Sequence, residues 1–523
     1  MRIISIVTLA AALIASQAAA QSTVLPVRLD PSVGGAQSGR ILVFAHKVAA
    51  AEKPSDSVDS TEFAPSDTAI AAREVDVFQP GATATVDGDV DAFPAAFSSL
   101  PAGTYRFQAV LDRDHNYNYG GRAGGDVVSP VVEAALPGPV PVLNLNKLLP
   151  ARTIDDILAG MPADRAATYR QSLGRVRAVD FVSPAMSDFW GRPVHMRGWV
   201  ALPPGYKDGG PRFPTVFSTG GYGSNLLSAQ LSAAGMVTMM AKGEAAPMIW
   251  VYLDQSTPAG THEFADSVNN GPWGKALTTE FIPWIEKQYA MDAKPASRFL
   301  TGHSSGGWAT LWLQVRYPSV FGGSWPTSPD PSDFHDFTGV DLYAADANVY
   351  RDGQGNARPL FRDHDKIVAT YEAFARMEAA LGPYGGQMAS FDWVFSPKGA
   401  DGRPVPMFDR ATGKVDPAVV AYWRDHYDVA NLVARDWKTL KPNLDGKIHL
   451  YVGTADSFYL DGAAHRLQAV FQSLGAHDDF TFVPGKTHFD LFTVGDDRQA
   501  LFKAMTWDMY AKARPGAKRP IKP

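Results

Sequence analysis

The chain has 523 residues, contains no cysteine and carries a formal net charge of −6 at pH 7. A disulfide framework is therefore excluded, and the mild negative charge does not support binding to nucleic acid. The length predicts two or three domains rather than one hydrophobic core.

Residues 1–20 are typical of a secretory signal peptide. Arg2 precedes an apolar run over residues 3–15, and three small alanines end at Ala20. The apolar run is shorter than the roughly 18 residues that span a bilayer. We expect cleavage near Ala20, a periplasmic or secreted protein, and no integral membrane segment in its mature form.

Residues 21–135 predict a domain of short β-strands. Segments 39–46, 82–88 and 103–112 alternate apolar and polar residues, and turn-forming residues separate them. This pattern, with no helical stretch, is typical of an all-β sandwich. The role of this domain stays open between packing against the rest of the chain and contact with carbohydrate.

The segment LDRDHNYNYGGRAGGD, residues 111–126, carries acidic and amide side chains that could bind calcium. It lacks the glycine that an EF-hand loop has at its sixth position, where Tyr117 stands instead. We expect a polar surface turn here rather than a metal site.

Residues 136–178 predict a connection between domains. The segment 136–150 has regularly spaced prolines and reads as a linker, and a polar helix follows over residues 154–175.

Residues 179–515 predict an α/β domain. Short apolar runs alternate with helical patterns such as residues 278–289, which favours a mostly parallel central sheet covered on both faces. Residues of about 327–440 interrupt this alternation, and we interpret them as an insertion that forms a cap over the carboxyl edge of the sheet. Residues 516–523 are expected to be a flexible tail.

The predicted cap contains one amphipathic helix and several aromatic loops. One face of the helix carries apolar residues at helical spacing, namely Ile367, Tyr371, Phe374, Met377 and Leu381. Four loop aromatics could line a substrate pocket or form the core of the cap: Trp393, Phe395, Trp423 and Tyr427.

The motif Gly-His-Ser-Ser-Gly over residues 302–306 is the candidate nucleophile turn. An apolar strand precedes it and a helical pattern with Trp308 follows, which is the context of a nucleophile elbow. The central residue, Ser304, is the expected nucleophile. Ser305 is expected to contribute its backbone N–H to an oxyanion hole at the start of the helix.

A serine nucleophile needs a base and an orienting acid, which follow it along the chain in α/β-hydrolases. Asp456 and His488 each come shortly after a predicted strand and suit these roles. Asp461 is the rival acid, and the rival histidines are His303, His449, His465 and His477.

The glycine-rich segment 219–223 follows an earlier strand and is expected to supply the second oxyanion donor. The sequence leaves open whether Gly221 or Tyr222 provides this N–H.

Several of these segments together resemble the esterase-D type of α/β-hydrolases, the putative-esterase group that includes feruloyl esterases, enterochelin esterase and S-formylglutathione hydrolase. The resemblance covers about residues 180–510. It rests on VALPPGY, STGGYGS, NNGPWGKALTTEFIPWIEKQY, GHSSGGWATLWLQVRYPSVFGG, VGTADSFYLDGA and GKTHFDLF.

This resemblance implies an α/β-hydrolase fold and a serine ester hydrolase with Ser304, Asp456 and His488 as its triad, without cofactor or metal. The sequence departs from the family where Thr219 replaces the histidine of many relatives, and in the long insertion. Substrate choice in such enzymes usually depends on that insertion, so no substrate is carried over.

We therefore expect a secreted serine carboxylic-ester hydrolase that forms an acyl-enzyme and acts on a small-molecule or glycan-linked ester. An acyltransferase of the mycolyl-transferase type is an alternative, because it is similar in fold and triad. An alternative of another class is a non-catalytic binding protein on a hydrolase scaffold.

Overall fold

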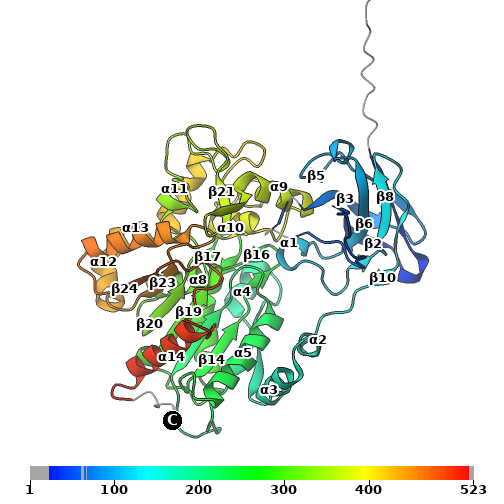
Figure 1. Cartoon of the computed structure of the whole chain (residues 1–523). Helices are drawn as coiled ribbons and strands as arrows, with labels where there is room; N and C mark the ends of the chain where they lie inside the picture. Colours follow the sequence, from blue (N-terminus) through cyan, green and yellow to red (C-terminus); the bar gives the residue numbers. More distant parts are fainter. Residues whose placement is uncertain (1–22, 61–63, 66, 518–523) are drawn as a thin grey trace, which may run out of the picture.

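The computed structural model describes residues 23–60, 64–65 and 67–517 (Figure 1). The predicted signal peptide, residues 1–20, and all but two residues of the predicted tail lie outside the described residues. The described residues include no helix long and apolar enough to cross a membrane.

The N-terminal domain consists of two packed sheets. A three-stranded sheet has the order β4-β1-β9, and the larger sheet has the order β10-β7-β6-β2-β3-β5 with β8 paired to β6. Its strands are β1 (Val24–Leu29), β2 (Gln37–Lys47), β3 (Thr68–Phe78), β4 (Thr83–Asp87), β5 (Ala92–Phe93), β6 (Gly103–Asp112), β7 (Val127–Val128), β8 (Val132–Leu136), β9 (Leu143–Leu145) and β10 (Lys147–Leu148). Val27, Val43 and Phe107 lie in the core between the two sheets.

The predicted linker differs from the structure. Part of segment 136–150 forms β9, which pairs in parallel with β1, and β10, which pairs with β7. The apolar side chains of Leu143 and Leu145 explain this, because both are buried in the core between the sheets. The predicted helix over 154–175 is two helices, α2 (Ile154–Ala159) and α3 (Ala163–Leu173), separated at Pro162.

An eight-stranded mixed sheet forms the centre of the second domain, in the order β11-β12-β14-β13-β19-β20-β23-β24. The strands are β11 (Val176–Val182), β12 (His195–Ala201), β13 (Thr215–Thr219), β14 (Ile249–Leu253), β19 (Arg298–His303), β20 (Gly323–Thr327), β23 (His449–Gly453) and β24 (Asp479–Val483). β12 pairs antiparallel with β11 and β14, and the remaining neighbours pair in parallel. The strands from β13 to β24 therefore end at one common edge.

Helices cover both faces of this sheet. Neighbouring strand residues point to opposite faces, so Val216 packs with α5 (Leu226–Ala241) and α14 (Ala500–Ala513), whereas Phe217 packs on the other side. That other side carries α7 (Ile282–Ile285) and part of α8 (Ser305–Arg316). The predicted helix over 278–289 consists of the π-helical residues Leu277–Phe281 and α7, and it ends at Ile285, four residues earlier than expected.

The cap follows β20. It contains β21 (Pro359–Asp363), β22 (Lys366–Thr370), α9 (Tyr371–Leu381), α10 (Gln387–Phe395), α11 (Pro417–His426) and α12 (Val429–Leu444). The predicted helix begins later than expected, at Tyr371, where the Thr370 hydroxyl accepts the N–H of Ala373 as an N-cap. Ile367 was wrongly placed on this helix, because it lies in β22 and its side chain is 55% exposed.

Three of the four cap aromatics form a core rather than a pocket. Phe395, Trp423 and Tyr427 are buried in one cluster with Trp308 and Trp312 of α8. Trp393 is half-buried. This packing attaches the cap to the helix that starts at the candidate nucleophile.

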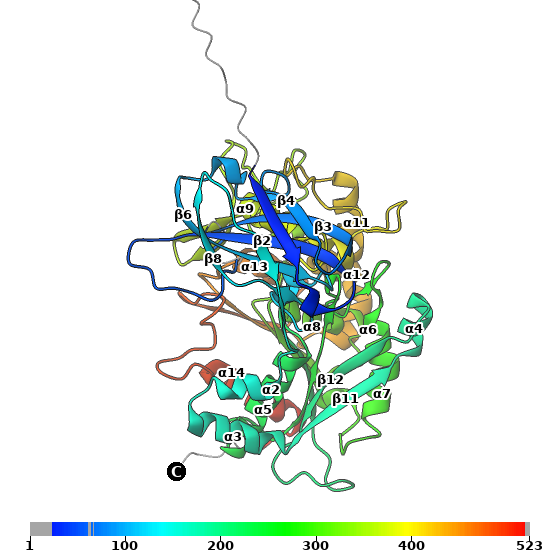
Figure 2. The ribbon, with the colours of Figure 1, turned by 90° about the vertical axis from the view of Figure 1, so that its right-hand side faces the viewer.

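The cap helix α9 lies between the N-terminal domain and the rest of the cap (Figure 1). Met377 and Leu381 of α9 pack against Leu42 and Phe44, which point outward from the sandwich. Arg40 of β2 donates two hydrogen bonds, of 3.2 and 2.9 Å, to the carbonyl oxygen of Ala380. In Figure 2, which is turned by 90° from Figure 1, the N-terminal strands lie in front of α9.

The segment 111–126 is not the expected surface turn. It contains the short helix α1 (Tyr117–Gly120), and Asp112, Tyr117 and Asp126 are buried. Asp112 accepts the N–H groups of Asn116 and Tyr117, and these hydrogen bonds order the turn.

We predict that Leu381→Ala lowers the free energy of unfolding by about 2–5 kcal/mol, because it leaves a cavity between the two domains. Chemical denaturation measures this change. Ile367→Ala, at an exposed apolar residue of the same cap, is the control and should change the free energy by less than about 0.5 kcal/mol. Equal effects of the two substitutions would contradict the assigned interface.

Candidate active site

Ser304 occupies a sharp turn between β19 and α8. Its backbone has φ 59° and ψ −127°, a left-handed conformation that is strained for a residue with a side chain. The Ser304 N–H donates to the carbonyl of Thr327 on β20 at 3.0 Å, and the Ser304 carbonyl accepts the N–H of Trp308 at 3.0 Å. Strand, turn and helix thus follow one another where the sequence predicts an elbow.

Two glycines allow this turn to contact its neighbours through backbone atoms. A Cβ on Gly302 would lie 2.2 Å from the carbonyl oxygen of Gly306. A Cβ on Gly306 would lie 2.4 and 2.5 Å from the carbonyl oxygens of Thr219 and Gly220. A larger residue at Gly302 would therefore collide with the start of α8, and one at Gly306 would separate the turn from segment 219–223.

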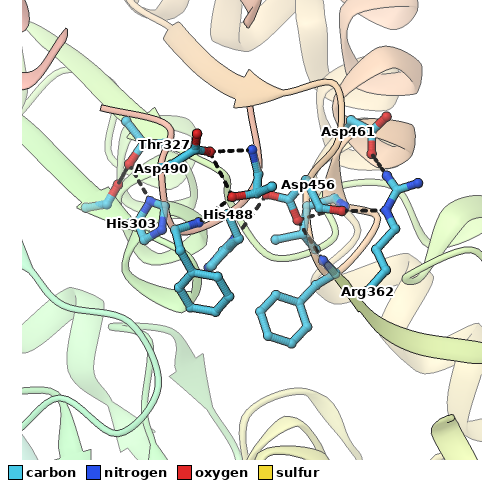
Figure 3. Close-up of polar contacts among 12 residues, drawn as sticks. His303, Thr327, Arg362, Asp456, Asp461, His488 and Asp490 are labelled. Atoms are coloured by element: carbon cyan, nitrogen blue, oxygen red, sulfur yellow. Dashed lines mark hydrogen bonds and ion pairs between the residues drawn. The ribbon is translucent and has the colours of Figure 1, made fainter. Parts of the chain in front are cut away.

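His488 and Asp456 form a buried hydrogen-bonded pair at the same edge of the sheet (Figure 3). The His488 Nδ1 lies 3.0 Å from Oδ2 of Asp456. The other carboxylate oxygen accepts the N–H of Phe458 at 2.9 Å. Burial raises the pKa of Asp456, but the charge of His488 and these hydrogen bonds outweigh burial and hold it below its ordinary value.

The rival acid and three of the four rival histidines have partners outside this pair. Asp461 forms an ion pair of 3.6 Å with Arg362 instead. Three rival histidines have partners elsewhere: His449 with Asp479, His465 with Phe482 and His477 with Asp445.

His303, the fourth rival histidine, lies against the candidate base. Its ring centroid lies 4.4 Å from that of His488, and its Nδ1 lies 3.0 Å from the hydroxyl of Thr327. Burial lowers the pKa of His303 to about 3, so its ring is neutral at neutral pH. Figure 3 shows His488 between His303 and Asp456.

Segment 219–223 lies directly against the elbow. A Cβ on Gly221 would be 3.0 Å from Cβ of Ser304 and 3.1 Å from the carbonyl oxygen of His303. Ser305 is fully buried at the first position of α8. Of the sequence-predicted oxyanion residues, Gly221 and Ser305 thus lie beside Ser304, and Tyr222 follows Gly221 in the chain.

Two residues that contact the candidate site could not be found by the motifs of the sequence. Arg362 of the cap donates from Nε to the carbonyl oxygen of Asp456 at 2.9 Å, and its guanidinium lies 4.1 Å from the ring centroid of Tyr459. No pattern in the sequence marks it. Asp330 accepts the hydroxyl of Ser305 at 2.6 Å, and its position just after β20 was an available signal.

Asp330 is fully enclosed, and burial raises its pKa to about 6 despite the hydrogen bond from Ser305. Glu263 is also buried, and burial together with the charge of Asp330 raises its pKa well above the ordinary value. Two buried acidic side chains therefore hold protons more tightly than usual, and one of them, Asp330, is bonded to the residue that follows Ser304.

The described residues contain no group of three or more His, Cys, Asp or Glu side chains that could hold a metal ion.

A family model matches much of the chain. The model of the family described as "Putative esterase" matches residues 191–505, more than half of the chain. The curated Bacillus subtilis protein described as "Uncharacterized protein YbbA" is 28% identical over 130 residues, which are 23% of this chain and 51% of YbbA. The chain thus spans about half the length of this relative.

A comparison with solved structures returns esterases and an S-formylglutathione hydrolase at low TM-scores. A ferulic acid esterase is 14% identical, with 65% of this chain and 97% of that chain covered and a TM-score of 0.38. An S-formylglutathione hydrolase from Agrobacterium tumefaciens is 14% identical, with 65% and 94% covered and a TM-score of 0.36.

We predict that Gly306→Ala lowers the free energy of unfolding by about 1–3 kcal/mol, because the new methyl group overlaps two backbone carbonyls. Chemical denaturation measures the change. Gly353→Ala is the matched control, because a Cβ there meets nothing within 4 Å, and it should change the free energy by less than about 0.5 kcal/mol. A neutral Gly306→Ala would refute the close backbone approach.

The raised pKa of Asp330 predicts a pH-dependent stability. Between pH 3.8 and about 6 the folded protein holds a proton on Asp330 that the unfolded chain releases, so folding loses stability as pH rises through this window. Asp330→Asn lacks this loss. Its free energy of unfolding, relative to the wild type, should rise across the window by up to about 1.4 kcal/mol per pH unit.

Urea denaturation at several pH values measures this difference. Asp409→Asn is the control, because hydrogen bonds from Thr412 lower the pKa of this exposed carboxylate. Its difference from the wild type should stay flat over the same window. A flat difference for Asp330→Asn as well would show that Asp330 is ionised throughout.

Proposed function

This chain belongs to the esterase family whose model it matches, and on that premise we propose that it is a serine carboxylic-ester hydrolase with Ser304, His488 and Asp456 as its triad. The observation that carries the proposal is the 3.0 Å hydrogen bond between His488 and the buried Asp456. An exposed histidine would need no such partner, whereas a general base must be held in one orientation.

His488 acts as the base in this mechanism. Because Nδ1 is occupied by the contact with Asp456, the imidazole proton stays on Nδ1 and Nε2 is available to accept the proton of Ser304. The carboxylate of Asp456 stays ionised because its pKa is lowered, and it stabilises the imidazolium that forms.

The reaction then proceeds in two steps. The oxygen of Ser304 bonds to the carbonyl carbon, the ester C–O bond breaks, and His488 gives its proton to the departing alcohol. Water, deprotonated by His488, attacks the acyl carbon, the bond from that carbon to the Ser304 oxygen breaks, and His488 returns the proton to Ser304 as the acid leaves. The N–H of Ser305 and an N–H of Gly221 or Tyr222 would stabilise the oxyanion in both steps.

The strain at Ser304 supports this role. A left-handed serine costs stability, of order 1–3 kcal/mol, and such residues gather at functional sites. An elbow of this kind would direct the hydroxyl away from β19 and toward the edge where β23 and β24 deliver Asp456 and His488. We also infer from residues 1–20 that the protein is exported and acts in the periplasm or outside the cell.

We predict that Ser304→Ala lowers kcat for p-nitrophenyl acetate at least about a thousandfold, because the nucleophile is lost. Ser305→Ala is the matched comparison. It keeps the backbone N–H and removes only the hydroxyl that donates to Asp330, so its loss should stay below about tenfold. Equal rates for the wild type and Ser304→Ala would refute the nucleophile assignment.

A further inference from the structure

A turn of the N-terminal domain reaches the loop beside the candidate nucleophile. Residues 116–121 leave the sandwich after β6 and form α1, which lies at the junction of the two domains (Figure 1). The polar composition of this turn suggested a solvent-exposed loop, but Tyr119 contacts the catalytic domain, whereas Tyr117 stacks on Phe44 of the sandwich.

The contacts between this turn and segment 219–224 are reciprocal. The hydroxyl of Tyr119 donates to the carbonyl oxygen of Ser224 at 2.5 Å. The hydroxyl of Tyr222 lies 2.6 Å from the carbonyl oxygen of Asn118. The rings of Tyr119 and Tyr222 meet edge to face, with centroids 5.2 Å apart. Each tyrosine therefore holds the backbone of the other segment.

The cap completes the junction. The Tyr222 hydroxyl also lies 2.6 Å from the carbonyl oxygen of Gly385. Its single hydrogen is therefore shared between one carbonyl of the turn and one carbonyl of the cap. The amide of Asn118 donates to the carbonyl oxygens of Glu378 and Gly382, at 2.9 and 2.8 Å, at the end of α9. Three parts of the chain are thus joined around Tyr222.

The position of this junction relates it to the chemistry. Gly221, the neighbour of Tyr222, approaches Ser304 closely, as a Cβ at Gly221 would lie 3.0 Å from Cβ of Ser304. Segment 220–223 contains three glycines, whose backbones are conformationally free unless something restrains them. Tyr222 carries the large side chain of this segment and is anchored outside the catalytic sheet.

We propose that the turn 116–121 is a positioning element of the oxyanion hole, so that the N-terminal domain is a working part of the active site. This inference rests on the proposed function. Oxyanion donors must be fixed within a fraction of an ångström to stabilise the transition state. The N-terminal domain supplies this restraint through Tyr119 and through the carbonyl of Asn118.

The test is Tyr222→Phe, which removes the shared hydroxyl and keeps the ring against Tyr119. With p-nitrophenyl acetate we expect kcat to fall about 10–100-fold and KM to change less than about threefold, because the lost restraint acts on the transition state. Affinity for a boronic acid that forms a tetrahedral adduct with serine should fall by a similar factor. Tyr119→Phe should reduce kcat in the same direction.

Tyr105→Phe is the matched control. Its hydroxyl also donates to a backbone carbonyl, that of Pro101 at 2.7 Å, but both residues lie within the N-terminal domain. Its kcat should stay within about twofold of the wild type. Thermal unfolding of all three variants shows whether each remains folded at the assay temperature.

Two results would overturn the inference. One is wild-type kcat and boronate affinity in both Tyr222→Phe and Tyr119→Phe. The other is a lowered melting temperature with unchanged kcat, which would make the junction a stabilising contact only. Either result leaves the proposed function intact if Ser304→Ala is inactive, whereas an active Ser304→Ala would instead refute the proposed function itself.

Discussion

The left-handed backbone of Ser304 is the constraint on which the rest of the site depends. This conformation is unfavourable, and it persists because both backbone polar groups of Ser304 are bonded, to Thr327 and Trp308. Thr327 ends the adjacent strand, so the elbow is coupled to the sheet itself. Gly306 then brings the carbonyls of segment 219–220 within van der Waals contact, which places the glycine-rich loop over the turn.

The parallel pairing from β13 to β24 supplies the second requirement. Parallel strands end at the same edge, so residues distant in sequence are delivered to one place without long side chains. Asp456 follows β23, and His488 follows β24. The cap contributes Arg362, which donates to the carbonyl of Asp456 and lies against the ring of Tyr459. These contacts hold the loop that carries Asp456.

The sequence could predict the site residues that strand ends position, but not those that contacts with distant segments position. Ser304, Asp456 and His488 each follow an apolar strand, and that local signal suffices to place them at one edge. Arg362 and Tyr119 act through contacts with residues 94 and 105 positions away, and no spacing in the chain encodes such contacts. The assignment of Ile367 to a helix failed because a β-strand next to a helix continued the apolar spacing by chance.

The N-terminal domain packs against the cap through a second apolar face of β2. An ordinary sandwich strand buries one face, but β2 is buried on both, with Val43 between the sheets and Leu42 and Phe44 against α9. Were the domain separated, this second apolar face would be exposed to water, at a cost of roughly 25 cal/mol per Å² of apolar surface. That face is therefore unavailable to carbohydrate, and packing against the cap accounts for its composition. A domain bound in this way can hold Asn118 and Tyr119 rigidly at the junction with Tyr222.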